Sequence, residues 1–165
     1  MRFWVCLLVI SVCISSCGDD IEFNSPAFQA DKDGVLWKSQ SRQARNDDGG
    51  ITVSGKLGSE TVALSIPSAT IDTFQLGAGK IANANYTNAS DTLYSTLYNP
   101  VDDPSTPEDE SLVYYAEGEI VIDDINTTEN YVSGSFWFTA YDGLGEHGVN
   151  FNKGVFYRVP FLVGN

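Results

Sequence analysis

The sequence has no cysteine after position 17, and this absence limits what can stabilise the folded part of the chain. Its three cysteines are Cys6, Cys13 and Cys17. The region that follows Cys17 therefore has neither an internal disulfide nor a zinc site with thiolate ligands. A hydrophobic core has to supply the stability, and 165 residues with 42 % hydrophobic content are sufficient for one domain with such a core.

Basic residues are also scarce. The chain has nine Lys and Arg residues against 22 Asp and Glu residues, which gives a formal net charge of −13. A surface of this sign repels phosphate backbones, so we expect no nucleic-acid partner. The same charge disfavours binding to anionic lipid by charge alone, so a membrane attachment would have to be covalent or hydrophobic.

No segment from Phe28 onward shows a convincing helical period of apolar residues. Residues 51–57, 61–67 and 92–98 are instead rich in β-branched and aromatic residues, and turn-forming residues flank them, which predicts strands. Gly58-Ser59 is the predicted turn of a hairpin. Many short strands separated by turns predict an all-β domain, an antiparallel β-sandwich or a partly open β-barrel with strands joined mainly by hairpins.

The last third of the chain has the clearest strand pattern. Three segments begin at Gly118, Gly134 and Gly154 and then alternate between two faces. The spacing of these glycines predicts a meander of long neighbouring strands. The face predicted to form the core carries Ile120, Ile122, Phe136, Phe138 and Phe156.

The amino-terminal residues have the pattern of an export signal. Arg2 precedes an apolar run from Phe3 to Ile14, which is too short to span a bilayer but suits the core of a signal peptide. Ile14-Ser15-Ser16-Cys17 then resembles the lipobox of bacterial lipoproteins, in which an aliphatic residue and two small residues precede a cysteine. An ordinary signal peptide cut elsewhere, or a short buried helix, is the alternative.

The lipobox resemblance implies cleavage before Cys17 and lipidation of its thiol. It divides the chain into a signal peptide (1–16), a lipidated acidic tether (17–26) and a single β domain (27–165). Several acyl chains, at about 0.8 kcal/mol per buried CH₂ group, would make the attachment effectively permanent.

Other segments resemble lipoproteins of the Bacteroides–Flavobacterium group. The acidic stretch 18–22 resembles the signal that places such lipoproteins on the outer face of the outer membrane, although a solvated acidic linker explains it equally well. The segments 33–37, 132–136 and 154–156 resemble uncharacterised small lipoproteins of the same group. The resemblance implies a lipid-anchored protein of the bacterial outer membrane, and it implies no activity.

Exposed aromatic residues are the strongest binding candidates. Trp137, Tyr157 and Tyr141 fall on the non-core phase of two strands that we expect to be neighbours. Flat rings on a sheet can stack on sugar faces, which predicts a glycan-binding surface. The alternative, which the pattern favours, is that a second layer or a loop covers these rings.

The other candidate sites are weaker. Asp102, Asp103, Glu108, Asp109 and Glu110 lie in a proline-containing stretch that predicts a solvated loop, with a weak calcium site as the alternative. Asp91-Thr92-Leu93 resembles the O-glycosylation sequence of the same bacterial group, and Thr92 would carry the glycan, but so short a pattern also occurs by chance.

Two further stretches fit turns better than sites. Asp31 to Gly34 resembles half of a calcium loop, but the remaining oxygen ligands are missing, and Asp-Gly predicts a hairpin turn. His147 is the only histidine, and its neighbour Glu146 would point the opposite way on an extended chain. We therefore expect an exposed turn residue rather than a member of a catalytic triad.

The sequence thus predicts a cell-envelope lipoprotein that acts as a non-enzymatic binding or interaction module for a glycan or a partner protein. An envelope hydrolase that uses loop carboxylates is one alternative, and a structural accessory of an export or uptake complex is another. We expect no cofactor, and we expect the membrane contact to be the N-terminal lipid.

Overall fold

The structure is a computed structural model that describes residues 27–47, 49–100 and 115–162. The predicted signal peptide, the lipidation site Cys17, the acidic tether and the acidic loop with its weak calcium option all lie outside these residues. Among the described residues, no helix is long and apolar enough to cross a membrane.

Strands account for all the regular secondary structure of the described residues. The eleven strands are β1 (Ala27–Lys32), β2 (Val35–Lys38), β3 (Ser41–Asp47), β4 (Gly50–Leu57), β5 (Glu60–Ile66), β6 (Thr73–Gly77), β7 (Asn83–Thr87), β8 (Leu93–Ser95), β9 (Glu117–Asn126), β10 (Tyr131–Asp142) and β11 (Gly148–Pro160).

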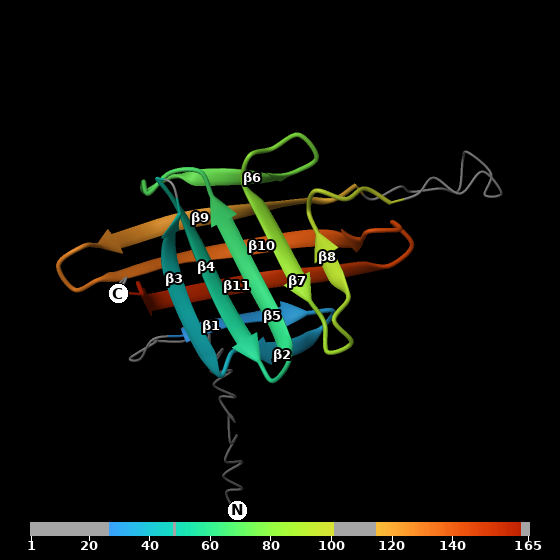
Figure 1. The fold of residues 1–165 in the computed structure, drawn as a ribbon, viewed down its shortest axis with the longest axis horizontal. Coiled ribbons are helices and arrows are strands. Elements are labelled where there is room, and N and C mark those ends of the chain that lie inside the picture. The colour runs from blue at the N-terminus through green and yellow to red at the C-terminus, as the bar shows by residue number, and fades with distance from the viewer. Residues whose placement is uncertain (1–26, 48, 101–114, 163–165) are drawn as a thin grey trace, which may run out of the picture.

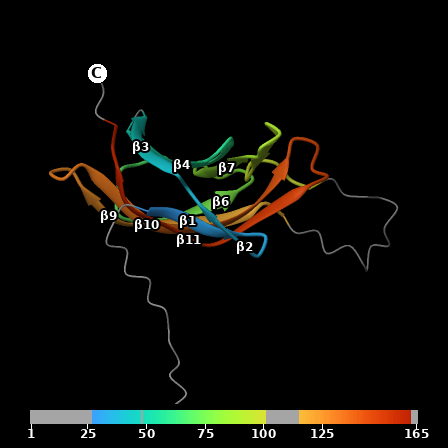
Figure 2. The ribbon, with the colours of Figure 1, turned by 90° about the horizontal axis from the view of Figure 1, so that it is seen from below.

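All of the strands belong to one antiparallel sheet that is strongly curled. Nine strands follow the order β2-β1-β11-β10-β8-β7-β5-β4-β3. β9 pairs with β10 along the same edge as β8, and β6 pairs with β9. Figure 1 shows β3, β4, β5 and β7 crossing in front of the long strands β9, β10 and β11. Seen from below in Figure 2, the two groups form layers that join on one side, where β10 and β11 rise toward the shorter strands. The predicted all-β antiparallel class is confirmed, in the form of a partly open barrel.

The curl brings the edge strand β3 near the residues that follow β11. The N–H of Leu162 donates to the carbonyl of Ala44 at 2.8 Å, and Phe161 forms a parallel bridge with Ala44. The end of the last strand therefore lies against β3. The barrel is closed along this short contact and remains open elsewhere.

Tight turns connect most of the paired strands, as predicted. Asp33 and Gly34 join β1 to β2 with φ values of 51° and 82°, which is the left-handed backbone that a two-residue hairpin requires. Gly58 and Ser59 join β4 to β5, and Gly58 has a φ of 60°. Asp-Gly and Gly-Ser adopt these angles at low cost, which explains why the turns occur here.

The core lies between the two layers and is rich in aromatic rings. Phe28 is central, with ring centroids 5.3 Å from Phe136 and 5.9 Å from Trp37. The residues predicted for the core face of the last three strands are all at most 3 % exposed: Ile120, Ile122, Phe136, Phe138 and Phe156. The meander β9-β10-β11 is also as predicted.

The strand predicted at 92–98 is much shorter in the structure. Strand β8 ends at Ser95, where a turn begins with a hydrogen bond from the N–H of Tyr98 to the carbonyl of Ser95. The side chain of Thr96 is fully buried and its hydroxyl accepts from the N–H of Ala84 at 3.0 Å. The N–H of Thr96 still donates to the carbonyl of Ala84 at 3.0 Å, but the hydroxyl takes the place of the second backbone bond of this pair, and the pairing of β7 with β8 ends there.

Candidate functional site

The open end of the curled sheet contains a polar cavity of about 310 Å³. The β1–β2 turn, the start of β5, the end of β7, the loop 88–92 and the start of β11 surround it. We call it the mouth cavity, and the side chains that matter for its chemistry are Lys32, Asp33, Glu60, Tyr86, Ser90 and Tyr94.

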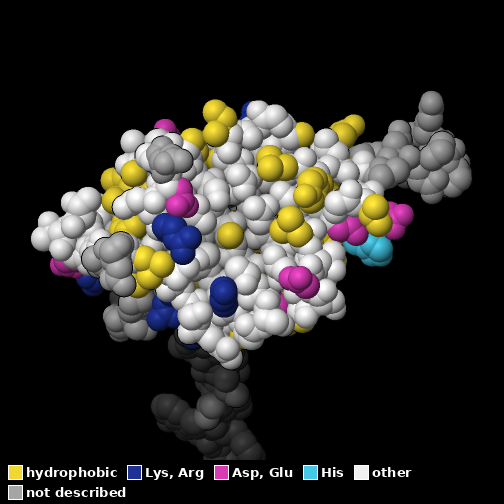
Figure 3. Space-filling view, in the orientation of Figure 1, with side chains coloured by type: hydrophobic (Ala, Val, Ile, Leu, Met, Phe, Trp, Pro, Cys, Tyr) yellow, Lys and Arg dark blue, Asp and Glu magenta, His cyan; other side chains and the backbone are white. Residues whose placement is uncertain are grey.

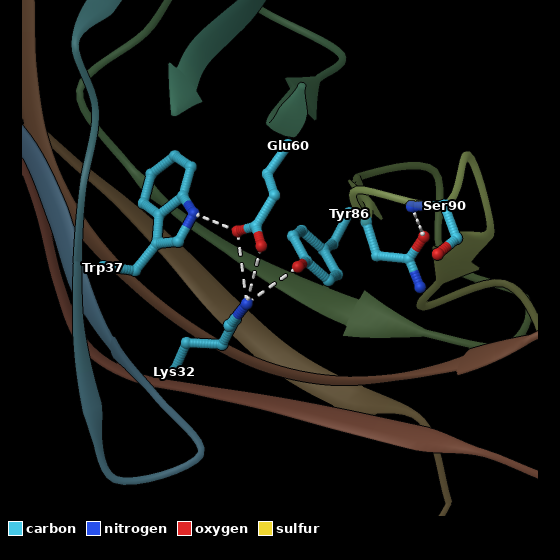
Figure 4. Close-up of polar contacts among 6 residues, drawn as sticks. Lys32, Trp37, Glu60, Tyr86 and Ser90 are labelled. Carbon is cyan, nitrogen blue, oxygen red and sulfur yellow. Dashed lines mark hydrogen bonds and ion pairs between the residues drawn. The ribbon is translucent and has the colours of Figure 1, made fainter. Parts of the chain in front are cut away.

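A hydrogen-bonded cluster forms one wall of the mouth cavity (Figure 4). The ammonium of Lys32 lies 3.1 Å from Glu60 Oε2 and donates to the hydroxyl of Tyr86 at 2.8 Å. The indole N–H of Trp37 donates to Glu60 Oε2 at 2.8 Å. Four residues from β1, β2, β5 and β7 are thus joined across strands that are not all neighbours in the sheet.

The sheet explains why charged side chains lie here. Lys32 has the same strand phase as the buried Phe28 and Ala30, and Glu60 has the same phase as the buried Val62. Both therefore point into the barrel at a strand position directly beside a turn: Lys32 is the last residue of β1 and Glu60 the first residue of β5. They are only 24 % and 21 % exposed as side chains, and their mutual pairing offsets the cost of this burial.

The pairing changes the ionisation of the three groups. Burial alone would lower the pKa of Lys32, but its hydrogen bonds to Tyr86 and Glu60 outweigh this and raise it above 10.5. Burial would raise the pKa of Glu60, but the bonds from Lys32 and Trp37 lower it below 4.5. Burial raises the pKa of Tyr86. At neutral pH, the cluster therefore holds an ammonium, a carboxylate and a neutral phenol.

Aromatic rings and a hydrogen-bonded loop form the rest of the wall. The rings of Tyr86 and Tyr94 lie 5.8 Å apart, and the ammonium of Lys32 lies 4.9 Å from the centroid of Tyr86. In the loop 88–92, Asn88 Oδ1 accepts from the N–H of Ser90 and of Thr92, each at 2.9 Å. Because the amide oxygen is used inside the loop, the amide NH₂ and the Ser90 hydroxyl are the groups left for a ligand.

The mouth cavity combines polar groups with aromatic surface. Its lining contains both hydrogen-bond donors and hydrogen-bond acceptors, and the rings of Tyr86 and Tyr94 supply a flat apolar surface beside them. No group of three or more His, Cys, Asp or Glu residues suited to a metal ion occurs among the described residues.

The structure separates the three predicted glycan-binding aromatics. Trp137 is 38 % exposed on the outer face of β10, whereas Tyr157 and Tyr141 are half-buried. Ser135 pairs with Val155, and Trp137 and Tyr157 extend from this pair in opposite directions. Measured along the strand direction, Trp137 and Tyr157 are four residues apart, which is about 13 Å. Tyr141 lies four residues beyond Trp137 on β10, about the same distance in the other direction. Trp137 instead lines a small cavity of about 180 Å³ with Glu119 and Lys153.

The remaining predicted residues lie in turns and loops. Thr92 is half-buried at the end of the loop 88–92. His147 lies in the β10–β11 turn with its side chain 71 % exposed, and its Nδ1 is 3.1 Å from Asp142 Oδ2. Burial would raise the pKa of Asp142, but bonds from the imidazole and from the N–H groups of Glu146 and His147 lower it. The hydrogen bonds between Asp142 and His147 therefore stabilise the β10–β11 turn.

Sequence reasoning did not find Lys32, Glu60 and Tyr86. A usable signal was present, because Lys32 and Glu60 each occupy the apolar phase of a strand directly beside a predicted turn. A charge in that position indicates a partner inside the fold. The identity of that partner, Glu60 for Lys32, depends on the curl of the sheet, which local sequence patterns do not specify.

The fold and the cavity define the class: a curled antiparallel β domain with a polar, aromatic-walled cavity at its open end. The chain belongs to the family described as domain of unknown function DUF6252, whose model matches residues 24–160. No curated protein and no solved structure matches the chain.

Proposed function

We propose that this protein is a lipid-anchored, non-enzymatic binding module of the bacterial cell envelope that takes a glycan into the mouth cavity. The observation that carries the proposal is the convergence of the Lys32–Glu60–Tyr86 cluster with the ring of Tyr94 around one cavity of about 310 Å³. That volume suits a single small ligand or the end group of a longer chain.

A saccharide fits this combination of groups. Its hydroxyls both donate and accept, so they match a wall with the ammonium of Lys32, the carboxylate of Asp33 and the hydroxyls of Ser90 and Tyr94. Its flat apolar face matches a tyrosine ring. The cluster is already held in place by its internal hydrogen bonds, so little side-chain ordering is left to oppose binding.

Hydrolysis is the less favoured reading of the same cavity. A glycosidase needs two carboxyl groups, one of which stays protonated to act as an acid. Glu60 is held as a carboxylate by Lys32 and Trp37, and its pKa is lowered rather than raised. This argues for recognition rather than proton transfer.

The groove beside Trp137 is the second candidate for a glycan. An exposed indole flanked by Glu119 and Lys153 offers stacking with polar neighbours. It is smaller than the mouth cavity, and Tyr157 and Tyr141 are too distant to join it.

A glycan array tests the proposal and separates the two sites. The probe is the mature chain, residues 17–165, carrying Cys17→Ser and a fluorescent label. Tyr94→Ala should weaken a positive signal about tenfold, which corresponds to about 1.4 kcal/mol. Tyr98→Ala is the matched control, because Tyr98 is exposed and does not line the cavity.

The outcomes lead to different conclusions. Loss of signal with Trp137→Ala and not with Tyr94→Ala would move the glycan site to the outer groove. If no glycan on the array gives a signal, the proposal of a glycan ligand is refuted. The ligand would then be sought as a partner protein that co-purifies from detergent extracts. The unfolding midpoint of each variant identifies losses caused by misfolding.

The lipid anchor is tested separately. Cys17→Ser should abolish incorporation of a labelled fatty acid in cells, because the anchor is proposed to depend on this thiol. Incorporation that persists in the variant would refute the anchor without affecting the glycan proposal.

A further inference from the structure

Strand β6 is an edge of the sheet that no charged side chain protects. Among the described strands, β2, β3 and β6 each have a neighbour on one side only. Edge strands of native proteins commonly carry charges, which prevent another chain from pairing with them. β2 ends with Lys38, and β3 carries two arginines and an aspartate. β6 consists of Thr73–Gly77 and has no charged residue.

The register of β6 shows which of its backbone groups face away from β9. The N–H of Ile122 on β9 donates to the carbonyl of Asp72 at 2.9 Å. Because bonded pairs alternate along an antiparallel ladder, every second residue from Asp72 points its backbone groups toward β9. The residues between them point theirs to the free edge: Thr73, Gln75 and Gly77.

The domain itself closes the two ends of this free edge. The N–H of Thr73 donates to Asp72 Oδ1 at 2.7 Å. The carbonyl of Gly77 accepts from the N–H of Lys80 at 3.1 Å. Gln75 lies between these two bonds, and among the described residues its N–H and carbonyl have no partner across the free edge. Gln75 therefore offers one donor and one acceptor to a further strand.

The side chains on either side of β6 form a partly apolar surface. Ile71 and Ile81 are 66 % and 81 % exposed, and they precede and follow the strand. Asp72 and Lys80 are exposed beside them, and among the described residues neither forms an ion pair. A cavity of about 370 Å³ lies between β6 and residues 79–82.

Figure 3 shows the same surface from one side. Yellow side chains lie along the upper rim of the molecule, with a dark-blue and a magenta side chain among them, and β6 runs along this rim in Figure 1. β9 pairs with the lower edge of β6 in that view, so the free edge points outward at the rim.

A two-fold axis through Gln75 makes this surface complementary to itself. In an antiparallel pair of β6 strands, the Gln75 residues of two copies exchange both of their free backbone bonds. Because the two strands run in opposite directions, the residues after β6 in one copy face the residues before β6 in the other. Lys80 of one copy then lies toward Asp72 of the second copy, and Ile81 lies toward the second copy's Ile71. The cavity beside residues 79–82 has room for this isoleucine.

We infer that the protein forms a two-fold symmetric dimer in which the β6 strands of two copies pair and join the two sheets. The net charge of −13 opposes association, but segment 71–81 contains one acidic and one basic residue and is therefore neutral. Repulsion between more distant charges is screened over about 8 to 10 Å in physiological salt. The mouth cavity shares no residue with this surface, so both mouth cavities stay open in the dimer.

Sedimentation velocity over a range of protein concentrations measures the association. The sample is the mature chain with Cys17→Ser, which removes the only cysteine of residues 17–165, so that no disulfide can link two copies. We expect an equilibrium between monomer and dimer that shifts toward the dimer as the concentration rises.

A proline at position 75 tests the strand pairing. Gln75→Pro removes the N–H that the second copy requires and leaves the bonds between β6 and β9, because that N–H points away from β9. The dissociation constant should rise about tenfold or more, since the dimer loses two hydrogen bonds. Gln75→Ala is the matched control. It also loses the side-chain bond to Glu119 but keeps the N–H, so it should associate like the wild type.

Reversal of charge tests whether the partner is a second copy. Lys80→Asp places acid against acid at both ends of the paired strands, and Asp72→Lys places base against base. Each variant alone should dimerise several-fold more weakly than the wild type. An equal mixture of the two should regain the association, because opposite charges then face each other at both ends. A dimer formed through another surface would not show this recovery.

A chain that remains monomeric at every concentration would overturn the inference. A dimer that Gln75→Pro does not weaken would also overturn it, and would indicate association through another edge such as β2. If Gln75→Pro lowers the unfolding midpoint, the mixture of charge variants decides, because both variants keep the sequence of β6. None of these measurements involves a glycan or a lipid, so their failure would leave the proposed function standing.

Discussion

Lys32 Nζ and Glu60 Oε2 lie 3.1 Å apart although 28 residues separate them in the chain. Their strands, β1 and β5, are not neighbours in the sheet. The ion pair therefore links β1 of one layer with β5 of the other at the open end of the barrel. Because both side chains are less than a quarter exposed, solvent screens the pair less than a surface salt bridge.

We predict an energetic coupling of about 1 kcal/mol between Lys32 and Glu60. The measurement is a double-mutant cycle with Lys32→Met and Glu60→Gln, followed by urea unfolding. Glu60→Gln keeps an acceptor for the Trp37 indole, so the cycle isolates the charge pairing. Lys153→Met combined with Glu60→Gln should be additive. Additive effects in the Lys32 cycle as well would show that the pair does not link the layers.

The stability should depend on pH through the same pair. The folded-state pKa of Glu60 lies below its ordinary value of 4.5. The unfolded chain therefore binds the proton more readily, and the stabilisation is complete above 4.5 and is lost as the pH falls through the folded-state pKa. The pKa of Lys32 is raised above 10.5, so its stabilisation is complete below that pH and is lost as the pH rises further.

Comparing wild type with Glu60→Gln isolates this contribution from other carboxylates such as Asp142. The difference in the free energy of unfolding should be constant near neutral pH and should shrink in acid below pH 4.5. A difference that grows in acid would contradict the lowered pKa of Glu60.

Local patterns were sufficient to predict the strands and their faces. Alternation placed Phe136, Phe138 and Phe156 in the core because a strand repeats every two residues, and each of these side chains is at most 3 % exposed. The turn at Asp33-Gly34 followed from the backbone angles that these residues tolerate. Such features depend on neighbours in the sequence, so the sequence alone predicts them.

Long-range register was not predictable in the same way. β10 and β11 are neighbours as expected, but bulges between Val132 and Gly134 and between Phe136 and Phe138 shift their pairing. The separation of Trp137 from Tyr157 follows from that register, which no local pattern specifies. The mouth cavity depends on the curl of the whole sheet and was missed for the same reason.

The two tryptophans of residues 17–165 should respond differently to a quencher. Trp137 is 38 % exposed and Trp37 is 2 % exposed with its indole N–H bonded to Glu60. Acrylamide should therefore quench chiefly the emission of Trp137. Trp137→Phe should leave a blue-shifted emission that acrylamide quenches weakly. Strong quenching that persists in this variant, with an unchanged unfolding midpoint, would show that Trp37 is accessible to solvent.

Close packing at Gly134 supplies the sharpest test of the core. A Cβ at this position would lie 2.5 Å from Phe156 Cζ and would also clash with the carbonyl of Val121. Gly134→Ala should therefore lower the free energy of unfolding by about 3 kcal/mol, because neither the ring nor the β9 backbone can move without disturbing the core.

Gly143→Ala is the matched control, because its Cβ would meet no atom within 4 Å and its φ is not positive. We expect it to change the stability by less than about 0.5 kcal/mol. Both values are measured by urea unfolding of the mature chain. Similar values for the two variants would mean that β9, β10 and β11 do not pack against one another as closely as their register requires.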